Sequence, residues 1–146
     1  MTDATQVYHV FIRATAEEIW EAITNPDRTA RYFYRTAIAI TPEARTTRGP
    51  DGDDWGTDAV LEFDPPRRLV HEWRSAYDEA LAGEPVSRVT WEIEQRGDGL
   101  CLVTLVHDRL EESPATAADV AGEGWMYVLS SMKSLLETGS GLPAAS

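Results

Sequence analysis

Cysteine is almost absent from this chain of 146 residues, which has Cys101 alone. A single cysteine excludes an intrachain disulfide and a cysteine-based metal cluster, and its apolar surroundings predict a buried, inert thiol. The chain also lacks any apolar run near the roughly 20 residues that a transmembrane helix needs. Its start has neither the basic nor the apolar stretch of a secretory signal, so we expect a cytoplasmic protein with no membrane partner.

Basic residues are scarce. Lys and Arg number 13 against 25 Asp and Glu, which gives a formal net charge of −12 and a pI near 4.5. Because this charge opposes binding to nucleic acids, we expect no nucleic-acid partner. The acidic residues concentrate in 51–64 and 108–123. We interpret both stretches as solvated loops, with a cation or partner site as the alternative.

Familiar catalytic motifs are missing as well. The chain has no G-x-S-x-G, no P-loop and no G-x-G-x-x-G sequence. His71 and His107 are chemically suited to acid–base catalysis, but we favour for them a hydrogen bond that fixes a strand end or a ligand. Glu72 would point to the opposite sheet face from His71, so a metal site would lack a third ligand. We therefore assign no catalytic residue, no metal and no cofactor, and leave the question of an enzyme open.

The remaining composition is that of a globular protein, with 42% hydrophobic and 26% charged residues. The length fits a single domain, residues 1–146. We place its ordered core at about residues 6–138. The small, glycine- and proline-bearing residues 139–146 predict a flexible tail.

Apolar alternation and turn sequences predict a series of strands. The expected strands are 6–13, 36–41, 59–63, 69–77, 87–94 and 100–110. The polar stretch 42–56 between the second and third of these strands is a candidate ragged hairpin, and an acidic loop is expected at 78–85.

Capping sequences locate the helices. Thr15 and Glu18 form a capping box at the start of a helix that runs to about residue 24. Asp27 is placed to cap a second short helix that extends to about residue 32. Ser113, followed by proline, predicts the cap of a last long helix that runs to about residue 137. Two glycines just before Trp125 predict a bend or a close backbone approach in this helix.

This order of elements predicts an α+β fold. One strand, two short helices, a run of antiparallel strands and one long helix differ from the alternating pattern of a doubly wound sheet. A curved antiparallel sheet that wraps around the long C-terminal helix would bury the apolar stripe of that helix.

Aromatic residues gather on the faces that we expect to point inward. Alternation along the strands and helical spacing in the last helix place them there, and the residues that follow the second short helix can line the same space. Aromatic walls with few polar groups are typical of small-molecule sites, although packed cores look similar. The candidate ligand-binding residues are Phe33, Tyr34, His71, Trp73, Trp91, His107, Trp125 and Leu129.

Four stretches of the sequence belong together as a pattern. They are the opening strand with ATAEEIWEAITNPDRTARYF, then VLEFDPPRRLVHEW, then SRVTWEIE with the later LVHDRL, and finally Gly124-Trp125 with Leu129, Met132 and Leu136. In combination they resemble the SRPBCC superfamily, also called START-like or Bet v 1-like, in the branch similar to the C-terminal domain of activators of Hsp90 ATPase. The resemblance covers roughly residues 6–140. One departure is that residues 44–47 stand near the place of a Gly-Gly pair found in many members.

The resemblance implies a helix-grip fold with a cavity between the curved sheet and the C-terminal helix. It also implies that an apolar or aromatic small molecule binds in that cavity. Two alternatives stay open. One is a polyketide cyclase- or dehydratase-like enzyme that uses His107 or His71 as acid–base and Tyr34 as a hydrogen-bond donor. The other is an Hsp90 co-chaperone-like protein partner. A homodimer is also open, and the fold alone does not fix the function.

Overall fold

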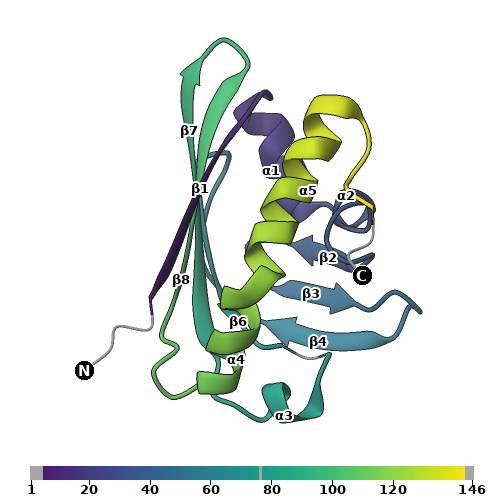
Figure 1. The fold of residues 1–146 in the computed structure, drawn as a ribbon, viewed down its shortest axis with the longest axis vertical. Helices are drawn as coiled ribbons and strands as arrows, with labels where there is room; N and C mark the ends of the chain where they lie inside the picture. Colours follow the sequence, from purple (N-terminus) through teal and green to yellow (C-terminus); the bar gives the residue numbers. More distant parts are fainter. Residues whose placement is uncertain (1–4, 76, 144–146) are drawn as a thin grey trace.

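The computed structural model describes residues 5–75 and 77–143, and within them the strands form two antiparallel sheets (Figure 1). The larger sheet has, in spatial order, β1 (Gln6–Ile12), β8 (Leu100–Asp108), β7 (Ser87–Gly97), β6 (Arg68–Trp73) and β5 (Val60–Asp64). The smaller sheet has β2 (Ala37–Ile40), β3 (Arg45–Arg48) and β4 (Asp54–Asp58). The hairpin expected within residues 42–56 is confirmed by β3 and the start of β4.

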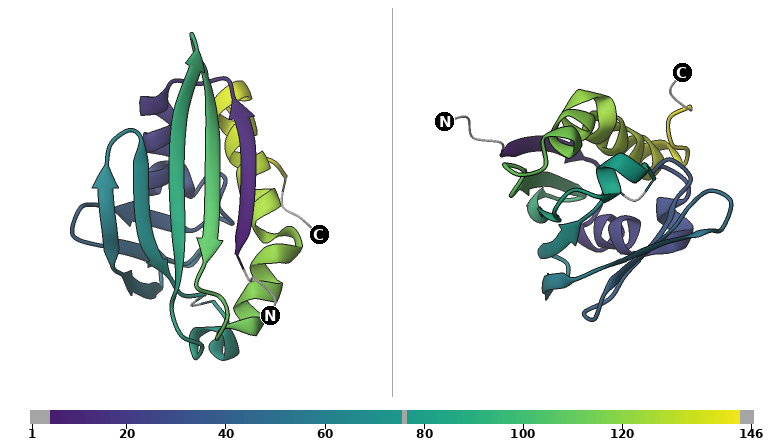
Figure 2. Two further views of the ribbon diagram at one scale, coloured as in Figure 1. Left: turned by 90° about the vertical axis from the view of Figure 1, so that its left-hand side faces the viewer. Right: turned by 90° about the horizontal axis from the view of Figure 1, so that it is seen from below.

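The helices lie on one side of the larger sheet (Figures 1 and 2). They are α1 (Ala16–Thr24), α2 (Pro26–Thr29), α3 (Glu79–Ala82), α4 (Pro114–Asp119), a π-helical segment η1 (Val120–Gly124) and α5 (Trp125–Thr138). α5 runs across the larger sheet, with the smaller sheet beside it. The expected α+β helix-grip fold is therefore confirmed. Within the described ranges, no helix has both the length and the apolar character needed to cross a bilayer.

The core lies between α5 and the inner face of the larger sheet. Alternation along β8 buries Val103, Leu105 and His107, while the residues between them are partly exposed. Leu105 lies opposite Trp91 on β7 in the antiparallel register. From α5, Met132 is fully buried against this layer. Each such large apolar side chain contributes about 1.5–3 kcal/mol by leaving water.

The strand expected over residues 69–77 ends at Trp73, which corrects that prediction. The Trp73 Nε1 donates to Ser75 Oγ at 2.9 Å, in a turn directly after the strand. Asp78 then accepts hydrogen bonds from the amides of Ala80 and Leu81, at 2.9 and 3.2 Å. This N-cap starts the short helix α3, so the expected acidic loop contains a helix.

One predicted helix cap is wrong, and a second is right in position but makes no capping hydrogen bond. The N-cap of α2 is Asn25, whose Oδ1 accepts from the amide of Asp27 at 2.9 Å. Pro26 occupies the first helical position, so the cap lies two residues before the predicted Asp27. Ser113 is the N-cap residue of α4, as predicted, but its side chain does not cap the helix, because its hydroxyl donates to the carbonyl of Pro85 at 2.8 Å.

The expected long terminal helix is divided into α4, η1 and α5. The carboxylate of Glu84 caps the start of α4, accepting from the amides of Ala115 and Thr116 at 3.1 and 2.7 Å. The π-helical turn of η1 ends at Gly124, in the region where the sequence predicts a bend. Single π-helical turns inside helices occur often at functional sites.

The capping box of α1 is confirmed and provides a first test. Thr15 Oγ1 accepts from the amide of Glu18 at 3.1 Å, and Glu18 Oε1 accepts from the amide of Thr15 at 3.0 Å. We expect Thr15→Ala to lower the free energy of unfolding by about 1 kcal/mol, measured by urea denaturation. The control Thr15→Ser keeps the hydroxyl and should change it by less than about 0.5 kcal/mol. Equal losses in the two variants would contradict a capping role.

Candidate ligand-binding site

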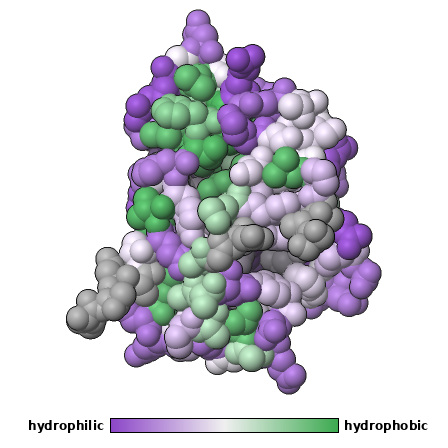
Figure 3. Space-filling model, viewed as in Figure 1, coloured by the Kyte–Doolittle hydropathy of each residue, from purple (hydrophilic) through white to green (hydrophobic). Residues whose placement is uncertain are grey.

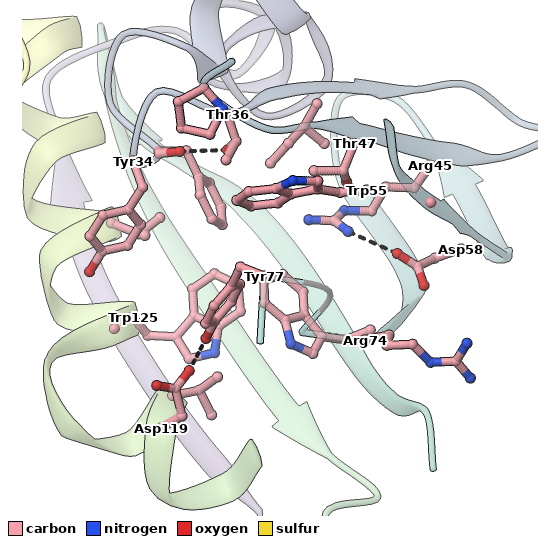
Figure 4. Close-up of a pocket in the computed structure, with 18 of the residues that line it drawn as sticks. Tyr34, Thr36, Arg45, Thr47, Trp55, Asp58, Arg74, Tyr77, Asp119 and Trp125 are labelled. Atoms are coloured by element: carbon pink, nitrogen blue, oxygen red, sulfur yellow. Dashed lines mark hydrogen bonds and ion pairs between the residues drawn. The ribbon is translucent and has the colours of Figure 1, made fainter. Parts of the chain in front are cut away.

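A cavity of about 610 Å³ lies between the smaller sheet, the end of β6 and the segment from α4 to α5 (Figure 4). The surface is hollowed between α5 and the smaller sheet (Figure 3). This volume falls within the range of about 300–1,000 Å³ that is typical of small-molecule sites. The aromatic lining residues are Phe33, Tyr34, Trp55, Trp73, Tyr77 and Trp125.

Three of these aromatic residues form the inner wall. Trp73 is the last residue of β6 and Trp125 is the first residue of α5, and their ring centroids lie 5.1 Å apart. Phe33, from the turn after α2, packs against both at 6.3 and 5.9 Å. Rings at these separations stabilise one another beyond their simple burial. The wall is therefore built from three elements that are distant in sequence.

Trp55 on β4 forms the facing wall. Figure 4 shows Trp55 and Trp125 entering the cavity from opposite sides. Trp55 packs over Gly49, where an added Cβ would lie 2.4 Å from the indole ring. Glycine at this hairpin position therefore leaves room for the Trp55 ring, and a larger residue at position 49 would displace the Trp55 side chain.

A buried ion pair lies on the wall that β3 and β4 provide. Arg45 and Asp58 are opposite each other in the register, and Arg45 Nη1 donates to Asp58 Oδ2 at 3.0 Å. The guanidinium also lies 4.8 Å from the centroid of the Trp73 ring, in a cation–π arrangement. Burial raises the pKa of Asp58, while Arg45 opposes that rise. The interpretation of 51–64 as solvated is therefore wrong for Asp58.

A second polar pair closes one side of the cavity. The Tyr77 hydroxyl donates to Asp119 Oδ2, joining the segment before α3 to the last residue of α4. Burial raises the pKa of Asp119. The Tyr77 ring also contacts Trp55, with ring centroids 6.1 Å apart. These contacts connect the facing wall to the region of η1.

The eight residues predicted from sequence divide into two groups. Phe33, Tyr34, Trp73 and Trp125 line the cavity. The other four residues lie in the core behind the inner wall and are not part of the cavity lining. They are His71, Trp91, His107 and Leu129. Ligand contact by any of the eight stays a prediction.

Both predicted histidines hold the aromatic layer in place. His107 Nδ1 accepts from Trp125 Nε1 at 3.0 Å, so its Nε2 carries the proton and donates to Ser87 Oγ at 2.7 Å. His71 Nε2 accepts from Trp91 Nε1 at 3.3 Å, and its Nδ1 donates to a backbone carbonyl at 2.9 Å.

Burial makes these imidazoles hard to protonate. Desolvation lowers the pKa of His107 to about 4, against an opposing effect of Asp108. Desolvation, with Arg45 adding to it, holds the pKa of His71 well below its ordinary value. Both side chains are therefore neutral at physiological pH. Among the described residues, no group of three or more His, Cys, Asp or Glu is arranged to hold a metal ion.

Sequence reasoning missed the polar residues of the cavity. These are Thr36, Arg45, Thr47, Thr57, Asp58, Arg74, Tyr77 and Asp119, and the aromatic Trp55 was missed with them. One feature of the sequence pointed to this wall: residues 44–47 stand near the place where many members of the family that the chain resembles have a glycine pair. That segment supplies Arg45 and Thr47, and their side chains occupy space beside the cavity where glycines have none.

Comparison with protein families agrees with the fold. Residues 13–137 match the family described as Activator of Hsp90 ATPase homolog 1-like protein. The chain belongs to this family. The branch inferred from the four sequence stretches is therefore confirmed. No curated protein matches the chain.

Several solved structures share the fold. CalU16 from Micromonospora echinospora is 25% identical with a TM-score of 0.70, and the match covers 95% of this chain and 77% of that one. DynU16, described as a putative protein in the dynemicin biosynthetic locus, is 24% identical with a TM-score of 0.74, covering 96% and 49%. The Aha1 dimer from Colwellia psychrerythraea is 19% identical with a TM-score of 0.71, covering 94% and 98%. Because DynU16 and the Aha1 dimer are less than 25% identical to this chain, their likeness shows the fold alone.

Proposed function

We propose that the protein binds an apolar or aromatic small molecule in the cavity between the smaller sheet and α5. The observation that carries this proposal is the aromatic lining of a cavity of about 610 Å³. Aromatic side chains present large, rigid apolar surfaces, and a few polar groups among them orient a ligand. Burial of the ligand's apolar area would supply most of the binding free energy.

The arrangement of polar groups favours binding over catalysis. An acid–base enzyme needs groups within hydrogen-bond reach of one reacting atom. His71 and His107 have both ring nitrogens engaged in the core, outside the lining. The polar pairs of the lining lie on separate walls, with Asp58 on the strand side and Asp119 on the helix side (Figure 4). We therefore place a cyclase-like enzyme second.

Native mass spectrometry of the purified protein is the direct test. We expect a fraction of the molecules to carry an apolar molecule, which solvent extraction would then identify. Titration with the uncharged fluorescent probe N-phenyl-1-naphthylamine gives a second readout. If the protein carries no small molecule and the probe does not bind, the proposal is overturned in favour of a protein-partner role.

A substitution on α5 should block the cavity. Val128 lines it, whereas Met126, two residues earlier, is exposed and outside the lining. We expect Val128→Trp to fill part of the volume and weaken probe binding at least about tenfold, equivalent to about 1.4 kcal/mol. Met126→Trp adds the same side chain outside and should bind as the unsubstituted protein does. Equal affinities in the two variants, both folded by circular dichroism, would place the probe elsewhere.

A further inference from the structure

Two polar side chains of the cavity have unused hydrogen-bonding capacity. Thr47 Oγ1 is buried without a hydrogen-bond partner, and no other side-chain nitrogen or oxygen of the described residues is in that state. Arg45 has five N–H donors, and its one side-chain hydrogen bond within the described residues goes to Asp58. Buried polar atoms are rarely left unpaired in folded proteins.

These two groups point to the same place. Arg45 and Thr47 are two residues apart on β3, so their side chains share one face of the strand. Both line the cavity, and Figure 4 shows them on one wall next to Trp55. A ligand atom that reaches this wall would meet guanidinium N–H groups and a hydroxyl together. An oxygen that accepts hydrogen bonds fits this pair, because the guanidinium can only donate.

The charge balance favours a neutral acceptor. Arg45 is already paired with Asp58, and the opposite charges make the pair neutral in sum. The Asp58 side chain is only 12% exposed, so it lies close to the cavity wall rather than in solvent. An anionic group placed against Arg45 would also approach the Asp58 carboxylate. The net charge of −12 further opposes the approach of an anion. Arg74, also in the lining, is the charge that favours an anion, and it is exposed to solvent.

The aromatic walls set the shape of the rest of the ligand. The Arg45 guanidinium lies over Trp73, and Trp55 faces the inner wall from across the cavity. A flat ring system inserted between these walls would pack against indole rings on two sides. Its edge would then be directed to the β3 wall.

We propose that the ligand is a planar aromatic molecule with a neutral carbonyl oxygen, which accepts hydrogen bonds from Arg45 and Thr47. This inference rests on the proposed function and names the chemical class of its ligand. The carbonyl would satisfy the Thr47 hydroxyl and a free guanidinium N–H at the same time. The aromatic rings would occupy the space between Trp55 and Trp73.

Three naphthalene probes of similar size test the proposal: 2-acetylnaphthalene, 2-naphthoate and 2-ethylnaphthalene. The first carries a neutral carbonyl, the second a carboxylate and the third no acceptor. We expect 2-acetylnaphthalene to bind tightest, about 3- to 10-fold more tightly than 2-ethylnaphthalene in calorimetry. Tighter binding of 2-naphthoate would overturn the neutral acceptor. Equal binding of all three would overturn the polar contact and leave the proposed function standing, whereas no binding of any probe would overturn both.

Thr47→Val isolates the hydroxyl, because valine has nearly the same shape and suits a strand. We expect it to weaken binding of 2-acetylnaphthalene about 3- to 10-fold and to leave 2-ethylnaphthalene unchanged. Thr46→Val, at an exposed neighbouring position outside the lining, is the matched control and should change neither affinity. The double variant Arg45→Gln with Asp58→Asn replaces the ion pair by a neutral pair and should also remove the preference for the ketone. If both variants keep that preference, Arg45 and Thr47 do not bind the carbonyl.

Discussion

Trp125→Ala is expected to lower the free energy of unfolding by about 3–5 kcal/mol, the usual cost of removing a large buried aromatic side chain. Trp125 is 2% exposed and is among the largest fully buried side chains of the protein. Its ring contacts Phe33, Trp73 and Trp91, with centroids 5.1–5.9 Å away. Urea denaturation measures the loss.

Part of this loss comes from a hydrogen bond. Trp125 Nε1 is the donor to His107 Nδ1 at 3.0 Å, and alanine would leave that buried nitrogen unpaired. An unpaired buried polar group costs about 1–3 kcal/mol. Trp125→Phe keeps an aromatic ring but removes the donor, so we expect an intermediate loss. If phenylalanine and alanine destabilise equally, the ring packing contributes little; if phenylalanine costs nothing, the hydrogen bond is unimportant.

Trp125 also lies on the cavity wall, so it can have two roles: it can fill the core, and it can contact a bound molecule. A residue that only fills the core would affect stability and leave a bound probe unaffected. Because Trp125 lines the cavity, we expect Trp125→Phe to alter the affinity for N-phenyl-1-naphthylamine as well. An unchanged affinity in this folded variant would assign Trp125 to the core alone.

The fold could be predicted from local patterns because each pattern has a local physical cause. Period-two alternation in β8 and the capping box at Thr15 depend on residues that are close in sequence. The prediction errors arose where side chains form hydrogen bonds with residues that are distant in sequence. The Ser113 hydroxyl donates to Pro85 rather than bonding to its own helix, and Glu84 accepts from the first turn of that helix from 31 residues away.

The cavity was half predictable for the same reason. Trp73 and Trp125 follow from apolar periodicity, since the inner wall is continuous with the core, and Phe33 follows from its place after the second short helix. Arg45 and Asp58 look like ordinary polar residues of a surface hairpin, and they meet only in the register of β3 and β4. The packing of Trp55 over Gly49 likewise depends on how that hairpin folds back. These positions require the three-dimensional pairing, which the chemistry of single residues does not specify.

The free energy of unfolding is expected to fall by about 2 kcal/mol between pH 7 and pH 5 through His107 alone. The unfolded imidazole titrates near 6.5, whereas burial lowers the pKa of His107 to about 4 in the folded protein. Between these values the unfolded state binds a proton that the native state does not, so stability rises with pH. The stabilisation is complete above about pH 6.5 and is lost as the pH falls to about 4. His71 acts in the same direction.

The charges around the two rings support this direction. Arg45 lowers the pKa of both, and Asp108 raises that of His107 without overcoming its burial. Carboxylates with lowered pKa values, such as Glu84, lose their stabilisation near and below pH 4.5. The raised pKa values of Asp58 and Asp119 act in the opposite direction to the histidines, so a variant of His107 is needed to isolate its contribution. His107→Gln cannot titrate and should reduce the fall in unfolding free energy by about 2 kcal/mol in urea denaturation at the two pH values. A variant that loses stability as steeply as the unsubstituted protein would show that the pKa of His107 is the same in the folded and unfolded states, and so would contradict the lowering by burial.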